Sequence, residues 1–309
     1  MDRNKSCSKG KKILLFILFI LLLLLVAGSA WGWSVWARIY EEVPEEGEYY
    51  YEHRETVQKE PDKNITNILI LGVDQRKNEA ARADAIIIMS INHDTGETAM
   101  ISIPRDSRVE IPGRGPDKIN AAMAYGGINL MRATVEKLLG VPINHYVYTN
   151  FAGFQHIVET LGGVTIDVEK TIEVITYGDG LPPVVLQPGV QKLNGLEALA
   201  YVRYRGDPEA DFGRMRRQQK FLKAVATETL QAENLFRLPK LLEQAAEYVR
   251  TDLSLVKALS LAKMAAGLDM EEIAAVTLQG KNSLIGGTAY VILDDEFLEQ
   301  TIDSYLRWN

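Results

Sequence analysis

Arginines gather in one short stretch of this sequence. Arg203, Arg205, Arg214, Arg216 and Arg217 all lie within residues 203–217 of a chain whose formal net charge is -7. A guanidinium group is planar, stays charged and donates two parallel hydrogen bonds, so it is suited to gripping phosphate. Against an acidic background the cluster favours an anion site, and a basic run on the surface is the alternative on these residues alone.

The residues between the arginines predict how they are presented. Gly206, Asp207 and Pro208 break the chain. If the piece before the break is extended, Arg203 and Arg205 point the same way. A helix is expected to begin near Asp211, and one of its faces then carries Arg214, Arg217, Gln218, Phe221 and Val225. Arg214 would lie in the first turn, where the helix N-terminus also favours an anion.

Charged residues also stand at the ends of three predicted strands. The apolar segment 67–73 ends at Asp74, as expected of a strand buried on both faces. Segments 85–91 and 98–103 predict a hairpin, because residues 92–96 are turn formers. Asp84 precedes this hairpin and Arg105 follows it, so the two should be neighbours. Asp74 joins them if the first strand is adjacent and parallel to the third.

Asp74 and Asp84 predict a metal site. Two neighbouring carboxylates repel each other unless a cation lies between them. Because only oxygen ligands are on offer, the expected ion is Mg²⁺ or Mn²⁺. Lys118 could add positive charge to the same site, although the spacing fits a charged residue at the start of a helix at least as well. Cys7 is the only cysteine and the histidines show no paired spacing, so no zinc site is expected.

The elements that position these residues form two parts. Residues 13–37 are uncharged and follow the basic segment 1–12. A transmembrane helix needs about 20 apolar residues, so we expect 13–37 to span a membrane with 1–12 in the cytoplasm. A cleaved signal peptide is the alternative. Residues 38–63 are interpreted as a linker, with a folded helix as the alternative.

Residues 64–309 are expected to form one α/β domain with a mixed central sheet flanked by helices. Further strands are predicted near 146–149, 164–168, 274–279 and 290–293. Helices are predicted near 128–139, 151–161, 195–202, 213–231, 239–250, 254–267 and 295–306, the last capped by Asp294. In open α/β sheets the crevice beyond the strand ends is the usual ligand site.

Together these motifs resemble the LytR–CpsA–Psr family of the bacterial cell envelope. They occur in the family's order at 71–76, 82–84, 102–106, 117–121, 124–127, 161–163, 193–195, 198–205, 211–214 and 217–219. The resemblance runs continuously over about 65–232, and the N-terminal anchor fits as well. Ala85 departs from the pattern, because the family usually has Thr there, but Asp84 is intact.

The resemblance implies an Mg²⁺-dependent phosphotransferase that crosses the membrane once. Its N-terminus would lie in the cytoplasm, and its α-β-α catalytic domain would lie outside the membrane. Such proteins move wall teichoic acids, capsular polysaccharides and related anionic glycopolymers from a polyprenyl (undecaprenyl) pyrophosphate carrier to peptidoglycan. The acceptor is the C6 hydroxyl of N-acetylmuramic acid. An acidic surface gives no reason to expect a nucleic-acid partner.

The resemblance also implies residue roles. Asp74 and Asp84 would hold Mg²⁺ on the pyrophosphate. The pyrophosphate clamp would consist of Arg82, Arg105, Arg203, Arg205, Arg214 and Gln218, with Lys118 as a further cation. Arg76 and Asp211 would orient these groups, and either Asp74 or Asp211 would be the base for the acceptor hydroxyl. The residues expected to carry catalysis are Arg105, Asp74, Arg203, Arg205 and Asp211.

Two other functions stay open on the sequence. One is a hydrolase of the same lipid pyrophosphate, with water in place of the sugar hydroxyl. The other is a non-enzymatic, membrane-anchored binding or regulatory protein. The presence of Asp74, Asp84, Arg105 and the arginine cluster speaks against the second.

Overall fold

The computed structural model describes residues 28–41, 64–74, 81–175 and 181–308. Their central element is a six-stranded sheet in the order β11-β6-β1-β2-β3-β12. Its strands are β1 (Ile65–Asp74), β2 (Arg82–Asn92), β3 (Thr98–Ser102), β6 (His145–Asn150), β11 (Val249–Thr251) and β12 (Ala274–Thr277). The pairs β1–β6 and β3–β12 are parallel and the other three are antiparallel. The predicted α/β fold with a mixed sheet is therefore confirmed.

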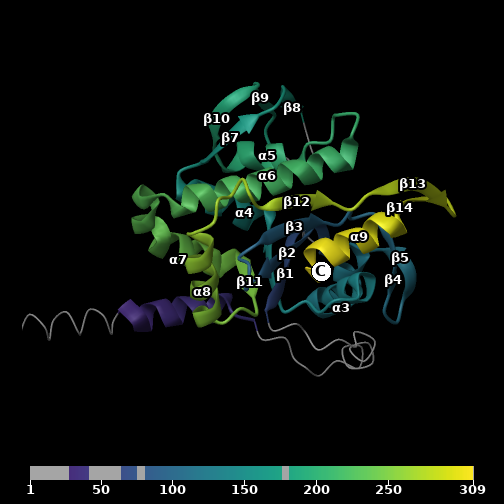
Figure 1. Cartoon of the computed structure of the whole chain (residues 1–309). Coiled ribbons are helices and arrows are strands. Elements are labelled where there is room, and N and C mark those ends of the chain that lie inside the picture. Colours follow the sequence, from purple (N-terminus) through teal and green to yellow (C-terminus); the bar gives the residue numbers. More distant parts are fainter. Residues whose placement is uncertain (1–27, 42–63, 75–80, 176–180, 309) are drawn as a thin grey trace, which may run out of the picture.

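Helices cover both faces of this sheet (Figure 1). α3 (Ala121–Leu139) and α9 (Asp295–Tyr305) pack on one face, and α4 (Phe151–Leu161), α5 (Gly195–Arg203) and α6 (Ala210–Leu230) lie on the other. The 3-10 helix η1 (Ala232–Arg237), α7 (Leu238–Tyr248) and α8 (Leu255–Ala265) follow α6. Four two-stranded sheets complete the described chain: β4 (Arg108–Ile111) with β5 (Gly115–Lys118), β7 (Val164–Val168) with β10 (Gly189–Leu193), β8 (Ile172–Val174) with β9 (Val184–Leu186), and β13 (Gly280–Ile285) with β14 (Thr288–Leu293).

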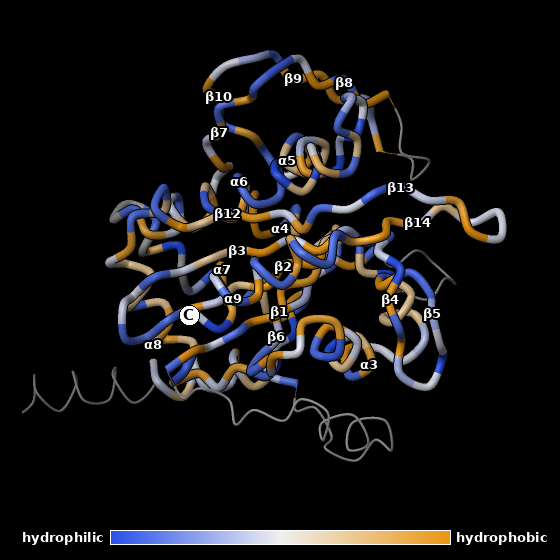
Figure 2. The backbone as a smooth tube through the Cα atoms, turned by 45° about the vertical axis from the view of Figure 1, so that its right-hand side comes forward, coloured by the Kyte–Doolittle hydropathy of each residue, from blue (hydrophilic) through white to orange (hydrophobic). Residues whose placement is uncertain are grey.

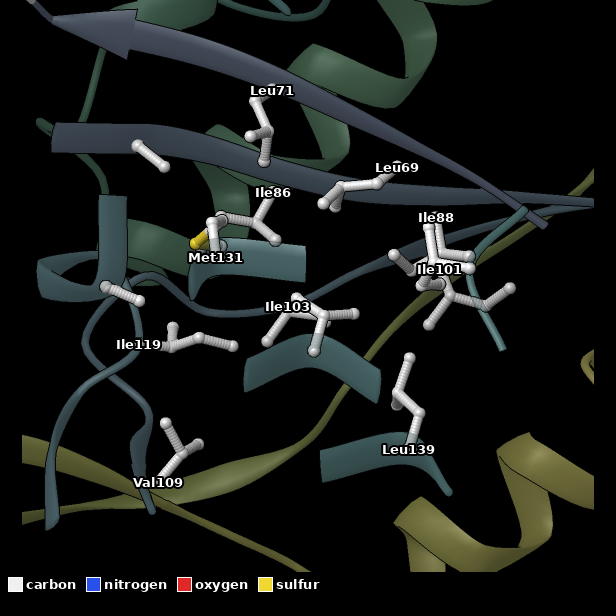
Figure 3. Close-up of a cluster of buried hydrophobic side chains, with 14 of the residues drawn as sticks. Leu69, Leu71, Ile86, Ile88, Ile101, Ile103, Val109, Ile119, Met131 and Leu139 are labelled. Carbon is white, nitrogen blue, oxygen red and sulfur yellow. The ribbon is translucent and has the colours of Figure 1, made fainter. Parts of the chain in front are cut away.

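The main core lies between the sheet and α3 and α9. Side chains alternate along a strand, so Leu69 and Leu71 of β1 point to this face together with Ile86 and Ile88 of β2 (Figure 3). They meet Met131 of α3, and all five are almost completely buried. Burying one such side chain stabilises the fold by about 1.5–3 kcal/mol. The opposite residues of β1 and β2 are left to face α6.

A second core forms under α4 and α5. Ile166 of β7, Leu186 of β9, Tyr201 of α5 and Phe221 of α6 are buried in it. Figure 2 shows hydrophobic stretches along the central strands and hydrophilic stretches in much of the outer turns. α6 contributes Phe221 to this second core and Leu222 to a smaller cluster with Ile70 and Ile87 of the sheet, so it lies between the second core and the sheet.

Gln219 fixes α6 over the sheet edge. Its side chain is buried, and its Nε2 donates to Ser102 Oγ of β3 at 2.9 Å and to the Val276 carbonyl of β12 at 2.7 Å. A buried amide left without partners costs free energy, so these bonds define one position of α6. The N-terminal turns of α6 are thereby held beyond the end of β3.

The helical residues 28–39 pack on the domain. Val35 and Ile39 are buried against Ala246 of α7, and Trp36 Nε1 donates to the Leu253 carbonyl at 3.1 Å. Within the described ranges, no helix combines the length and apolar character that crossing a membrane requires. Residues 13–27 of the predicted membrane span lie outside those ranges.

Residues 38–41, which the sequence assigns to the linker, also contact the domain. Tyr40 forms an isolated parallel β-bridge with Thr251 of β11, and the Glu41 amide donates to the Thr251 carbonyl at 2.8 Å. Tyr146 and Tyr148 of β6 donate their hydroxyls to Glu41 at 2.8 and 2.9 Å. Desolvation and the nearby Glu41 charge raise the pKa of both tyrosines.

Most predicted elements agree with the structure. The predicted bounds of α4 and β7 match, and Asp294 caps α9 by accepting from the Phe297 amide at 3.0 Å. β4, β5, β11 and β13 were not predicted, because each is short or has no period-two pattern of burial. Lys118 consequently ends strand β5 instead of beginning a helix.

Candidate active site

A cavity of about 600 Å³ opens between the sheet and the helices α4, α5 and α6. Seven of the residues picked out by the sequence line it: Asp74, Asp84, Arg105, Arg203, Arg205, Arg214 and Gln218. We call this set the polar end. The apolar part is lined by Ile70, Ile87, Phe151, Phe154, Leu199, Val202, Phe221 and Leu222, among others.

The polar and apolar parts follow from the direction of each element. On β1 the same face carries Ile70, Gly72 and Asp74 in that order. On α6, Arg214 comes first and Leu222 comes two turns later, where it packs with Ile70 and Ile87. Each element therefore places charged side chains near the strand ends and apolar side chains beneath the helices. The cavity is amphipathic along its length.

A β-bulge aims Asp84 into the cavity. Gly72 pairs with Ala85 and Val73 pairs with Ala83, so Asp84 is the extra residue of β2. A bulge changes the direction of a side chain that regular alternation would turn to the other face. A Cβ added to Gly72 would lie 3.2 Å from the Ala85 Cβ, closer than ordinary van der Waals contact. The strands are thus packed tightly where the two carboxylates come together.

The strand order differs from the simplest expectation. β1 and β3 run in the same direction but are not adjacent, because β2 lies between them. The end of β1 and the end of β3 therefore flank the start of β2. Asp74 and Arg105 reach the same cavity from either side of Asp84.

Arg105 links the carboxylates near the strand ends. Its Nη1 forms an ion pair with Asp84 Oδ1, and its Nε lies 3.7 Å from Asp106 Oδ2. Lys118 Nζ lies 2.8 Å from the other oxygen of Asp106. Arg105 and Lys118 therefore belong to one charged network, although Lys118 does not line the cavity.

The helix side of the polar end is built around Asp211. Its Oδ2 accepts a hydrogen bond from Arg214 Nη2 at 2.9 Å, and its Oδ1 lies in ion-pair contact 2.7 Å from the same nitrogen and 3.4 Å from Arg205 Nε. Burial raises the pKa of Asp211, although the positive charges of Arg205 and Arg105 act against this. Burial and the charge of Arg105 lower the pKa of Arg205. Cations crowded in a desolvated cleft are typical of a site that receives an anion.

Arg203 approaches the cavity from the end of α5. Its guanidinium carbon lies 4.4 Å from the centre of the Phe151 ring, in cation–π geometry. Tyr204 adopts an extended conformation, and it separates Arg203 from Arg205. Arg203 is helical, so it is not part of an extended piece as predicted, and both arginines line the cavity.

Arg217 has a structural position. Its Nε donates to Glu169 Oε1 at 2.6 Å, its Nη1 donates to the Tyr204 carbonyl at 3.1 Å, and it pairs with Asp207. The side chain of Arg217 is 5% exposed and that of Asp207 is 4% exposed. Arg216 is exposed and pairs with Glu209. Neither arginine lines the cavity, so three of the five clustered arginines do.

The other sequence candidates lie around the cavity. Arg82 is exposed at the start of β2, opposite Asp74 in the ladder. Asp211 holds cavity-lining arginines without lining the cavity itself. Arg76 lies outside the described residues. Among the parts of the chain that the structure describes, no group of three metal-ligating side chains is found.

Sequence reasoning missed polar residues contributed by β6 and β8. Thr149 and Asn150 line the cavity at the end of β6, which is parallel to β1. The rule that located Asp74, polar residues after a strand, would have found them. Asn150 also caps α4, accepting from the Gly153 amide at 2.9 Å. Glu173 of β8 also lines the cavity, and no sequence signal marks it.

Comparisons with known proteins agree with this architecture. The LytR_cpsA_psr family model matches residues 35–305. The polyisoprenyl-teichoic acid–peptidoglycan teichoic acid transferase TagU of Bacillus cereus is 34% identical over 250 residues, covering 79% of this chain and 80% of TagU.

Two solved structures are similar as well. TagV of B. subtilis has a TM-score of 0.69 at 30% identity, over 80% of this chain and 99% of TagV. The LytR-CPS2A-psr family protein YwtF (TagT) with bound octaprenyl pyrophosphate lipid, a B. subtilis protein, has a TM-score of 0.63 at 32% identity, over 80% of this chain and 91% of that one.

Proposed function

This chain belongs to the LytR–CpsA–Psr family, and we propose that it transfers an anionic glycopolymer from a polyprenyl pyrophosphate carrier to peptidoglycan. The observation that carries the proposal is the amphipathic cavity. A polyprenyl pyrophosphate is a diphosphate joined to a long hydrocarbon chain. The cavity has the complementary order, with cationic side chains at the sheet edge and aliphatic and aromatic side chains beneath the helices.

The arginines of the polar end bind the diphosphate. Arg105 follows β3, Arg203 ends α5, Arg205 lies in the segment after α5, and Arg214 belongs to α6. Because they reach the cavity from different sides, together they can contact several oxygens of both phosphates. Asp211 orients two of them through its hydrogen bond to Arg214 and its ion pair with Arg205. Phosphoryl transfer depends mainly on such positioning and on stabilising the charge of the transition state.

The reaction is an attack of a sugar hydroxyl on phosphorus. The C6 hydroxyl of N-acetylmuramic acid forms a new P–O bond to the phosphorus that carries the glycopolymer. The bond from this phosphorus to the bridging oxygen breaks, and polyprenyl monophosphate leaves with the electron pair. The hydroxyl proton passes to a carboxylate, which we assign to Asp74 because it lines the cavity whereas Asp211 does not. The product on peptidoglycan is a phosphodiester.

Asp74 and Asp84 suit a magnesium ion. Mg²⁺ usually takes one or two carboxylates together with substrate phosphates, and these two carboxylates line the same cavity as the arginines. Mn²⁺ accepts the same oxygen donors. When bound there, the ion would neutralise negative charge on the pyrophosphate.

We also place the catalytic domain outside the cell membrane, anchored by a single helix. The uncharged segment 13–37 and the basic segment 1–12 support this orientation. The carrier's hydrocarbon is embedded in the same membrane. Packing of residues 35–41 against α7 and β11 would hold the domain close to the anchor.

Arg105→Ala tests the catalytic proposal directly. The full-length protein in detergent is assayed on a lipid-pyrophosphate oligosaccharide, with and without peptidoglycan fragments. Loss of one charged contact made in the transition state should lower turnover by roughly 10²–10³. Arg216→Ala is the matched control, because Arg216 is exposed and outside the cavity. Undiminished turnover by Arg105→Ala would show that Arg105 has no part in catalysis. Release of the glycan at the same rate with and without peptidoglycan fragments would identify a hydrolase.

A further inference from the structure

Tyr125 occupies an unusual position in α3. Its side chain is 45% exposed, and the helix is kinked directly after it at Gly126 and Gly127. Gly127 has φ 63° and ψ −154°, which side chains rarely permit. A Cβ on Gly126 would lie 2.6 Å from the Leu130 Cβ. Both glycines are therefore required by the kink, and the Tyr125 ring beside it is open to solvent.

Charged side chains surround this ring. The guanidinium carbon of Arg114 lies 5.3 Å from the ring centre, and the Tyr125 hydroxyl donates to Asp117 Oδ2 at 2.6 Å. The charges of Arg82 and Arg114 both act on the hydroxyl, while the bond to Asp117 raises its pKa. Arg82, Arg114, Asp117 and Tyr125 are named the Tyr125 patch below.

The patch adjoins the polar end of the cavity. Arg82 pairs across the ladder with Asp74, which lines that end. Asp117 precedes Lys118, which bonds to Asp106 beside Arg105. A ligand on the Tyr125 patch would therefore lie near the strand ends that carry Asp74, the carboxylate that we assign as the base for the acceptor hydroxyl.

Resting on the proposed function, we infer that the Tyr125 patch binds the glycan strand of the peptidoglycan acceptor. The donor's hydrocarbon occupies the cavity from beneath the helices, so the acceptor hydroxyl must approach the phosphorus from the outer surface at the strand ends. The patch supplies that surface.

The chemistry of the patch matches a saccharide that carries carboxylates. The face of an aromatic ring is negative, and it packs well against the slightly positive C–H face of a pyranose. Arg82 and Arg114 offer charge-assisted bonds to the carboxylates of peptidoglycan, and the Asp117 carboxylate can accept from sugar hydroxyls. Tyr125 lies beside the kink, and Arg114 and Asp117 belong to the β4–β5 hairpin, so these three groups need little ordering on binding.

Tyr125→Ala in the full-length protein tests this assignment. Peptidoglycan fragments are titrated in the transfer assay, and their direct binding is measured by isothermal calorimetry. We expect the acceptor KM and the fragment Kd to rise roughly 5–10-fold, the range that an aromatic contact provides. The donor KM should not change. Tyr125→Phe should retain most of the affinity, because it keeps the ring.

Phe236→Ala is the matched control, because it removes an exposed ring of η1, which is 73% exposed. A Tyr125→Ala protein with unchanged Tm that binds and uses the fragments like wild type overturns the inference. If wild type shows no transfer, the proposed function fails, and the binding measurement still decides the patch. Equal fragment binding by Tyr125→Ala and Phe236→Ala would then overturn it, and selective loss in Tyr125→Ala would support it.

Discussion

Arg217→Met separates the structural arginine of α6 from the cavity-lining arginines. Arg217 is buried between Glu169 and Asp207, and it does not line the cavity. Methionine fills much of the same volume, so the change removes mainly charge and hydrogen bonds. We expect a large loss of stability and nearly normal turnover per folded molecule.

The size of the loss follows from the partners left behind. Removing one member of a buried ion pair costs about 3–5 kcal/mol. Two features place Arg217→Met at the low end: Lys170 Nζ remains 3.1 Å from Asp207, and the Glu169 side chain is 40% exposed to screening water. We expect about 3 kcal/mol, which lowers the Tm by roughly 6–12 °C in a domain of this size.

Thermal unfolding and transfer assays are run on the same preparations. Asp207→Asn combined with Arg217→Met should recover part of the loss, because it removes the carboxylate that the single variant leaves poorly compensated. Arg214→Met, one turn earlier and lining the cavity, should lose turnover by roughly 10²–10³. A fall of that size in Arg217→Met at unchanged Tm would contradict the structural role.

Three further outcomes are expected. A chelator should abolish transfer and added Mg²⁺ should restore it, as measured by product formation; activity that survives exhaustive chelation would contradict the metal site. Transfer should fall as pH drops through the pKa of Asp211, which burial raises above its ordinary 3.8. Asp211→Asn should lower activity at every pH and should flatten the acidic side of the pH–rate profile. The stability contribution has the opposite sign, because a raised carboxyl pKa favours the folded state below 3.8 and this contribution is lost as pH rises through the folded pKa. Gly153→Ala should destabilise the fold by about 1–3 kcal/mol in urea unfolding, because its Cβ would overlap Tyr248 and Thr149; a neutral effect would show that α4 can shift.

The sequence predicts much of the fold because the long elements carry strong patterns. The apolar strands β1 to β3 and the helices α5, α6 and α9 bury the faces that their periodicity implies, whereas α8 has no buried residue. β4, β5, β11 and β13 are stabilised by pairing and tertiary contacts more than by their own residues, so local pattern could not locate them. The prediction that Lys118 begins a helix was wrong for this reason, because Lys118 belongs to β5, which pairs with β4.

The candidate site was predictable to the level of residue type and strand end. The bulge at Asp84 was not, because it depends on a register shift between β1 and β2 that leaves no mark in the residues themselves. The roles of Arg214 and Arg217 were not separable either, since both lie on one helical face. The two arginines differ because Arg217 forms an ion pair with Glu169, a residue far away in the sequence.

The electrostatics of the polar end also bear on how the product leaves. Arg205 and Arg105 lie close enough for the charge of one to lower the pKa of the other, and burial lowers the pKa of Arg205 further. A bound anion relieves this repulsion. The donor presents a diphosphate, whereas the carrier retains a single phosphate after transfer. A single phosphate can contact fewer of the cavity-lining arginines than a diphosphate can, so these arginines hold the spent carrier less strongly than the substrate.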